Sequence, residues 1–255
     1  MINDNLVWCP GNNFGDKLSP VLYKHLTGRD AVFRPKTFKG KKFVSIGSIL
    51  NWASPGDIVW GAGLARRTDN VSKDLFIKAV RGPLTRDICL SRGVKAPEVY
   101  GDPAMLLPLF YERSPVITTT LGIIPHIVDI PHVRIAGPGI KIINLTDPID
   151  KVIKDITECV AVISSSLHGL IVADAYDIPN MWVKITDKVL GDGTKFNDHF
   201  LAVGRATKKP LVLSGNMKVE EMVNMIEPEE VVFDRDKLLA ACPFKLQSEA
   251  LNVNK

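Results

Sequence analysis

Residues 160–175 read VAVISSSLHGLIVADA, and this stretch decides the fold that the sequence predicts. It opens as an apolar run typical of a buried strand and closes as a helix, which should end near residues 177–179. Three serines and His168 lie at the join. A strand that leads through a hydroxyl-rich turn into a helix presents free backbone N–H groups and the positive end of the helix dipole. The join therefore predicts an anion site beside a histidine.

The composition is that of an ordinary globular protein of 255 residues, long enough for one large domain or two smaller ones. No apolar run approaches the ~20 residues that a membrane helix needs. The first residues, Met1 to Asn5, lack the basic and apolar segments of a signal peptide, so we expect a cytoplasmic protein. The four cysteines are scattered, which indicates reduced thiols rather than disulfides or a zinc site. Nothing in the sequence demands a metal.

The charge balance is mildly basic, with 32 Lys and Arg against 28 Asp and Glu. This balance is not the footprint of a nucleic-acid-binding protein, and we expect no nucleic-acid partner. Residues 34–42 form a basic segment with interleaved phenylalanines. A solvated loop is one interpretation of this segment, and an anionic membrane surface or a polyanionic glycan as its partner is the other.

Short apolar runs alternate with helical runs along the chain, which predicts an α/β fold with mostly parallel sheets. Pro20 is expected near the start of the first helix. The pattern relaxes around residues 108–115, so we expect two α/β units, residues 1–112 and residues 113–255 with terminal helices. Ligands of such sheets bind beyond the carboxyl ends of the strands. The polar clusters expected to converge there, on a cleft between the domains, are residues 12–16, 61–66, 81–82, 101–102, 126 and 164–168.

Several of these residues have both a functional and a structural interpretation. Arg81 lies between a strand and a helix start, where its guanidinium suits a phosphate or carboxylate, although a salt bridge to a nearby acid is the alternative. Asp16 could accept a hydroxyl proton or simply belong to a turn that starts a helix. Asp102 could cap a helix. His126, at a strand end, could face the ligand or be a half-buried polar residue.

With these residues assembled, the sequence resembles the polysaccharide pyruvyl transferase family. The matching stretches are NFGD at 13–16, VRGPLT at 80–85, GDPA at 101–104, GIIPH at 122–126, and residues 164–179. The resemblance implies a fold like that of GT-B glycosyltransferases, with two Rossmann-like domains around a cleft. It implies transfer of the pyruvyl group of phosphoenolpyruvate onto two hydroxyls of one sugar, giving a cyclic ketal. The implied acceptor is a glycan, often a lipid-linked exopolysaccharide repeat unit, which suggests peripheral association with the inner face of a membrane.

The resemblance also implies roles for individual residues. The leucine–histidine pair of the family falls on Leu167 and His168, and its phosphoenolpyruvate-binding arginine on Arg81. Many members carry an arginine where this chain has Ser166; hydroxyls, helix N–H groups or another cation (Lys184, Lys195 or Arg205) would have to replace it. We expect His168 to act as the general acid, with Asp16 and His126 as further catalytic candidates. The expected binding residues are Asn13, Gly15, Gly63, Arg81, Arg86, Ser164, Ser165, Ser166, Leu167 and Lys184. No cofactor is expected besides phosphoenolpyruvate as donor substrate.

Two other functions fit the same sequence. A nucleotide-sugar glycosyltransferase can have the same GT-B fold, because a fold does not determine a function. Its ribose-binding carboxylate would come from a late helix, where Glu220, Glu221 and Glu227 lie. A non-catalytic glycan-binding subunit is the third possibility.

Overall fold

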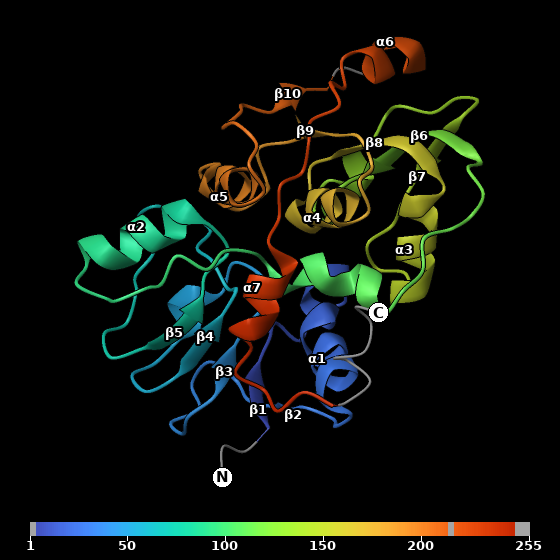
Figure 1. Cartoon of the computed structure of the whole chain (residues 1–255). Coiled ribbons are helices and arrows are strands. Elements are labelled where there is room, and N and C mark those ends of the chain that lie inside the picture. Colours follow the sequence, from blue (N-terminus) through green and yellow to red (C-terminus); the bar gives the residue numbers. More distant parts are fainter. Residues whose placement is uncertain (1–3, 214–216, 248–255) are drawn as a thin grey trace.

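The computed structural model describes residues 4–213 and 217–247, and it contains two parallel β-sheets (Figure 1). The first sheet has the order β2-β1-β3-β4-β5 and the second the order β10-β9-β8-β6-β7. Every pairing between these strands is parallel, which confirms the predicted α/β class. The strands are β1 (Asn5–Val7), β2 (Val32–Phe33), β3 (Phe43–Val44), β4 (Ile58–Trp60), β5 (Phe76–Ala79), β6 (Thr119–Ile124), β7 (Ile140–Ile142), β8 (Cys159–Ser164), β9 (Asn180–Lys184) and β10 (Leu211–Val212).

Helices connect and cover the strands. They are α1 (Phe14–Thr27), α2 (Pro83–Ser91), α3 (Ile149–Thr157), α4 (Leu167–Ala175), α5 (Thr194–Ala202), α6 (Val219–Asn224) and α7 (Arg235–Ala240), with 3₁₀ turns η1 (Leu50–Trp52), η2 (Pro103–Leu109) and η3 (Ile130–His132). None of the helices in the described part of the chain has both the length and the apolar character needed to span a bilayer.

The first helix begins earlier than Pro20 predicts. The side chain of Asn13 accepts a hydrogen bond from the N–H of Gly15 at 3.3 Å and caps α1. Pro20 therefore lies inside the helix, where it removes one backbone hydrogen bond without ending the helix. The expected start was wrong because the Asx cap at Asn13 overrides the preference of proline for a first turn.

The strand–turn–helix predicted for residues 160–175 is present as β8 and α4. β8 is central in its sheet, between β6 and β9, and residues 161–164 are buried. α4 carries apolar residues all round, which suits a helix enclosed by protein on every side. The carboxyl end of β8 is therefore held rigidly, and whatever follows it has a defined position.

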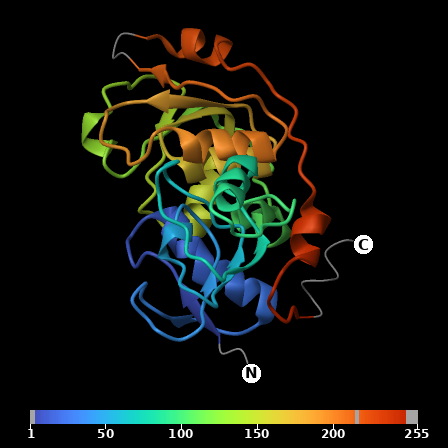
Figure 2. The ribbon, with the colours of Figure 1, turned by 90° about the vertical axis from the view of Figure 1, so that its left-hand side faces the viewer.

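One apolar cluster joins the two sheets with their helices. It includes Leu18 of α1 and Leu106 of η2 on one side, and Ile153 of α3 and Leu170 of α4 on the other. Phe14 and Leu167, the first residues of α1 and α4, also belong to this cluster. Such a shared core gives the residues at these helix starts fixed relative positions. Figure 2 shows the two halves of the molecule from the side, with the red segment near the end of the chain running from one half to the other.

The chain returns to the first sheet at its end, as the red segment of Figure 1 shows. The indole N–H of Trp60 donates to the carbonyl of Leu238 in α7 at 3.0 Å. Phe244 packs edge-on against Tyr23, Phe43 and Trp60, with ring centroids 4.8–5.5 Å apart. Residues 238–244 therefore lie against the first sheet, although the predicted boundary assigns them to the second unit. The boundary at residue 112 itself stays a prediction.

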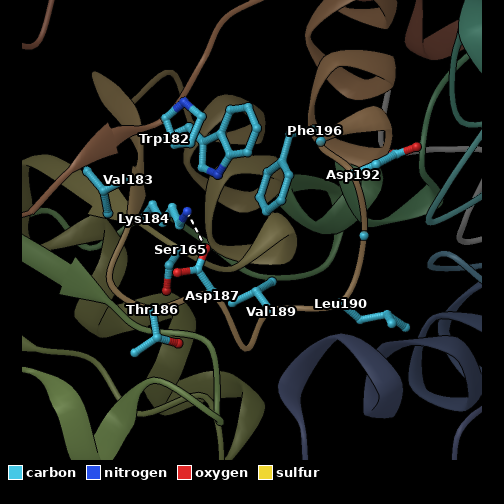
Figure 3. Close-up of a pocket in the computed structure, with 13 residues that line it drawn as sticks. Ser165, Trp182, Val183, Lys184, Thr186, Asp187, Val189, Leu190, Asp192 and Phe196 are labelled. Carbon is cyan, nitrogen blue, oxygen red and sulfur yellow. Dashed lines mark ion pairs between the residues drawn. The ribbon is translucent and has the colours of Figure 1, made fainter.

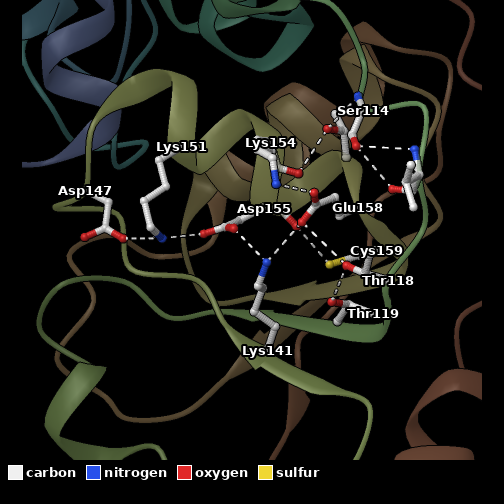
Figure 4. A network of polar contacts seen from close by, with 12 residues as sticks. Ser114, Thr118, Thr119, Lys141, Asp147, Lys151, Lys154, Asp155, Glu158 and Cys159 are labelled. Carbon is white, nitrogen blue, oxygen red and sulfur yellow. Dashed lines mark hydrogen bonds and ion pairs between the residues drawn. The ribbon is translucent and has the colours of Figure 1, made fainter.

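A network of ion pairs secures α3 to the edge of the second sheet (Figure 4). The Lys141 ammonium lies 2.7 Å from a carboxylate oxygen of Asp155 and 3.2 Å from one of Glu158. Lys151 pairs with Asp147 and Asp155 along the helix. The network pairs all its charges, so its role is structural.

Candidate functional site

His168 lies in the first turn of α4, and two glycine backbones make room for its ring. A β-carbon added to Gly15, in the first turn of α1, would lie 2.0 Å from Nδ1 of His168. A β-carbon on Gly47, after β3, would lie 3.7 Å from Cε1, and the backbone there has a φ of +98°, which favours glycine. The site thus combines elements of both sheets, and Gly47 is a residue that the sequence analysis missed.

Asp102 is the acidic neighbour of His168. Its Oδ2 lies 3.8 Å from Nε2 of His168, which is too far for a hydrogen bond, and it accepts one from the N–H of Gly47 at 3.0 Å. Its Oδ1 accepts from the N–H of Ala104 at 3.0 Å, so the predicted capping role is confirmed. Asp102 is fully buried. Besides capping η2, its carboxylate faces the imidazole of His168.

The Nε2 atom of His168 is buried and has no hydrogen-bond partner among the described residues. Burial lowers the pKa of His168, the Asp102 carboxylate opposes this effect, and the positive charges of Arg81 and Lys195 reinforce it. The imidazole is therefore neutral near pH 7 in the free protein. An anionic ligand placed beside it would raise its pKa and promote protonation.

The serines of the opening motif hold the turn in shape. The hydroxyl of Ser164 donates to the carbonyls of Ile124 and Ser166 at 2.9 and 2.8 Å. The hydroxyl of Ser165 donates to Asp129 at 2.6 Å. Ser166 is the N-cap residue of α4, but its side chain makes no capping hydrogen bond to the first N–H groups of the helix. Leu167 is buried in the core and anchors the turn.

His126 follows β6 and lies beside this turn. The register pairs Ile124 of β6 with Ser164 of β8, so the residues that follow each strand meet. The backbone N–H of His126 donates to the Ser165 hydroxyl at 3.0 Å. Burial lowers the pKa of His126 to about 4, and the charge of Lys195 adds to the effect. His126 is therefore a neutral imidazole in the free protein, near the same cation that acts on His168.

Asp16 is adjacent to the glycine that contacts His168. It lies in the first turn of α1, where Asn13 is the cap. Burial raises the pKa of Asp16 to about 6, against a smaller opposing effect of the Cys9 thiol. A carboxylate with this pKa is ionised at neutral pH and still basic enough to take a proton from a hydroxyl in a transition state.

Arg81 is completely buried and already has protein partners. Its guanidinium lies 3.0 Å from Asp198 of α5, and it donates to the hydroxyl of Ser48 at 2.7 Å and to the carbonyl of Leu64 at 2.6 Å. Gly63 lies directly against it, because a β-carbon there would be 2.4 Å from Cζ. The salt bridge that the sequence left open as an alternative is thus present. Direct binding of phosphoenolpyruvate by Arg81 or Gly63 stays a prediction.

Two other predicted binding residues also have partners. The guanidinium of Arg86 lies 3.1 Å from Glu98 and donates to the carbonyl of Ala96. Lys184 pairs with Asp187 at the rim of a cavity of about 230 Å³ (Figure 3). The ring of Trp182 in this cavity stacks on Phe196, with centroids 4.2 Å apart, and Ser165 reaches the cavity from the α4 turn.

Comparison with known proteins identifies a matching family and two relatives. A family model described as polysaccharide pyruvyl transferase matches residues 2–186. The succinoglycan biosynthesis protein ExoV of Rhizobium meliloti (strain 1021) is 29% identical over 231 residues, which cover 83% of this chain and 67% of that protein. The uncharacterized protein L143 of Acanthamoeba polyphaga mimivirus is 27% identical over 197 residues, which cover 71% of this chain and 68% of that protein. No solved structure matches the chain.

Proposed function

Because this chain belongs to the polysaccharide pyruvyl transferase family, we propose that it moves the pyruvyl group of phosphoenolpyruvate onto two hydroxyls of one sugar. The product is a cyclic ketal on an exopolysaccharide or capsule repeat unit. The similarity to a succinoglycan biosynthesis protein supports an exopolysaccharide acceptor. Phosphoenolpyruvate is the donor substrate in this proposal, and no cofactor takes part.

The observation that carries the proposal is the environment of His168. Its Nε2 has no hydrogen-bond partner within residues 4–213 and 217–247 and faces the buried carboxylate of Asp102. The histidine also lies at a helix start whose N–H groups have no side-chain cap. Phosphoenolpyruvate has two anionic groups and needs a proton at its methylene carbon. A histidine beside an anion site, able to take up a proton when the anion binds, suits both requirements.

The reaction has two bond-forming steps. In the first, one sugar hydroxyl adds to C2 of phosphoenolpyruvate while His168 delivers a proton to the methylene carbon, which becomes a methyl group. In this proposal Asp16, which follows Gly15 in the first turn of α1, takes the proton of the attacking hydroxyl. In the second, another hydroxyl of the same sugar displaces the phosphate from C2. Each ketal therefore releases one inorganic phosphate, and the proton lost by the second hydroxyl leaves with the phosphate or a base.

In this proposal, the acceptor sugar occupies the cavity shown in Figure 3. The aromatic side chains of Trp182 and Phe196 offer an apolar wall, while Lys184 and Asp187 provide polar groups for hydroxyls. Ser165 links the cavity to His126 and the α4 turn. The two sheets on either side of the site support a GT-B-like arrangement, with donor and acceptor bound between the two units.

Membrane association through the basic segment 34–42 is a further part of the proposal. Lys36, Lys39 and Lys41 are exposed, whereas Lys42 forms a buried ion pair with Asp57 and adds no charge to the surface. Binding would be peripheral and sensitive to salt. In flotation with anionic liposomes, the wild type should associate at low salt and a variant with glutamine at the three exposed lysines should not. No association of the wild type would exclude docking through this segment.

The test of the function is mass spectrometry of candidate glycans incubated with the protein and phosphoenolpyruvate. We expect a ketal on the glycan and an equal amount of released phosphate. Incubation with nucleotide sugars is the parallel assay for the glycosyltransferase alternative. Glycosyl transfer without any dependence on phosphoenolpyruvate would overturn the proposal.

A further inference from the structure

Lys195 is a buried cation without a counter-charge. It lies in the first turn of α5, and 7% of its surface is exposed. Within residues 4–213 and 217–247, its ammonium forms neither an ion pair nor a hydrogen bond; the face of the Phe196 ring, 5.2 Å away, is the contact it makes. The other buried cations there each pair with a carboxylate: Lys42 with Asp57, Arg81 with Asp198, and Arg205 with Asp174.

A largely buried lysine without a carboxylate partner among the described residues carries a desolvation cost, so its position suits an anionic ligand. Burial and the nearby charge of Arg81 lower the pKa of Lys195 to about 8. The side chain is therefore still mostly charged at neutral pH. Nothing in the packing of α5 onto its neighbours uses this charge, since Asp198 of the same helix already binds Arg81.

The charge of Lys195 acts on the two histidines of the candidate site. It lowers the pKa of both His168 and His126, so the ammonium lies within electrostatic reach of the two imidazoles. α5, which carries Lys195, packs against α4, whose first turn holds His168 and has no side-chain cap. A cation, helix N–H groups without a side-chain cap and a histidine whose Nε2 has no partner among the described residues are a combination that suits an anionic ligand.

We propose that Lys195 binds an anionic group of the donor substrate, the phosphate or the carboxylate of phosphoenolpyruvate. This inference rests on the proposed function and adds a residue to its site. Lys195 supplies the positive charge that Ser166 cannot. Of the other two cations that the sequence offers for this role, Lys184 pairs with Asp187, and Arg205 is held by Asp174 and Glu229.

The test is calorimetric titration of phosphoenolpyruvate into the wild type and into Lys195→Met, Lys195→Arg and Lys151→Met. Lys195→Met should bind phosphoenolpyruvate roughly tenfold to a hundredfold more weakly than the wild type, because it loses a charge-assisted contact. Lys195→Arg should recover part of the affinity because it keeps the charge. Lys151→Met is the control, since it removes a lysine that pairs with Asp147 and Asp155 in the structural network of α3, and it should bind as the wild type does.

Titrations with inorganic phosphate and with pyruvate identify the group that Lys195 holds, because the methionine variant should lose affinity for one of them. Removing an unpaired buried charge should leave the unfolding temperature unchanged or raise it, which separates a binding role from a structural one. If Lys195→Met binds phosphoenolpyruvate as tightly as the wild type does, the role of Lys195 is overturned and the proposed function is not affected. A wild type that binds a nucleotide sugar and not phosphoenolpyruvate would overturn the proposed function as well.

Discussion

The imidazole of His168 rests against the backbone of Gly15, so closely that a β-carbon on Gly15 would lie 2.0 Å from Nδ1. This contact joins the first turn of α1 to the first turn of α4, and Asp16 follows directly after it. The general acid and the general base of the proposed reaction are therefore set by one helix-to-helix contact that only glycine permits.

Gly15→Ala should displace the imidazole without unfolding the protein, because alanine is well tolerated in a helix. We expect turnover to fall on the order of a hundredfold, since catalysis is sensitive to small displacements of a reacting group. The control is Gly137→Ala, where the nearest atom to an added β-carbon is Cδ1 of Ile140 at 4.0 Å. Steady-state kinetics and thermal unfolding of both variants check this. Wild-type turnover in Gly15→Ala would mean that the position of His168 is not critical.

Arg81→Ala should destabilise the protein. The substitution leaves the carboxylate of Asp198 buried without its counter-charge, and such a loss costs about 3–5 kcal/mol. Adding Asp198→Asn should restore part of the stability, because the unpaired charge is then gone. Chemical denaturation of the single and double variants measures this. If Arg81→Ala keeps its stability and loses only affinity for phosphoenolpyruvate, Arg81 binds the substrate as the sequence predicts.

The pH dependence of the rate should report Asp16. Its pKa is raised to about 6 by burial, so the ionised form that acts as base is lost as the pH falls through that value. We expect kcat/KM to decline below about pH 6 in the wild type. Asp16→Asn should be slower throughout and should lack that decline. Because the donor substrate titrates equally in both assays, an identical acid limb in the variant would assign the limb to the ligand instead of Asp16.

His168→Gln should bind phosphoenolpyruvate at near-normal strength and lose turnover on the order of a hundredfold or more. Glutamine keeps a hydrogen-bond donor but cannot deliver a proton at neutral pH. The comparison of kcat and KM between variant and wild type checks the role. A variant that keeps kcat and raises KM would make His168 an anion-binding residue, and His126 would be the next candidate for the acid.

The sequence was informative where the structure is local. Residues 160–175 form a strand, turn and helix with His168 at the helix start because the apolar flanks and the polar join demand it. The same reasoning misplaced the start of α1, since Asn13 and Pro20 offered competing signals. Helix starts are decided by one or two side chains, and a single cap outweighs an average propensity.

The tertiary relationships were beyond the sequence. Asp102 and His168 are 66 positions apart, and a local pattern shows Asp102 only as a helix cap. Whether Lys184 or Lys195 carries a free charge depends on the neighbours that the fold supplies, Asp187 for one and the Phe196 ring for the other. The salt bridge of Arg81 likewise needed the position of α5.

The most direct test of the central claim, that His168 is the proton donor to phosphoenolpyruvate, is the number of protons taken up when the ligand binds. Calorimetry in two buffers of different ionisation enthalpy measures it. Burial keeps the pKa of His168 low in the free protein, and the bound anion should raise it, so the wild type should take up as much as about one proton. His168→Gln should bind phosphoenolpyruvate without this uptake. Equal uptake by both proteins, or no binding of phosphoenolpyruvate by the wild type, would contradict the claim.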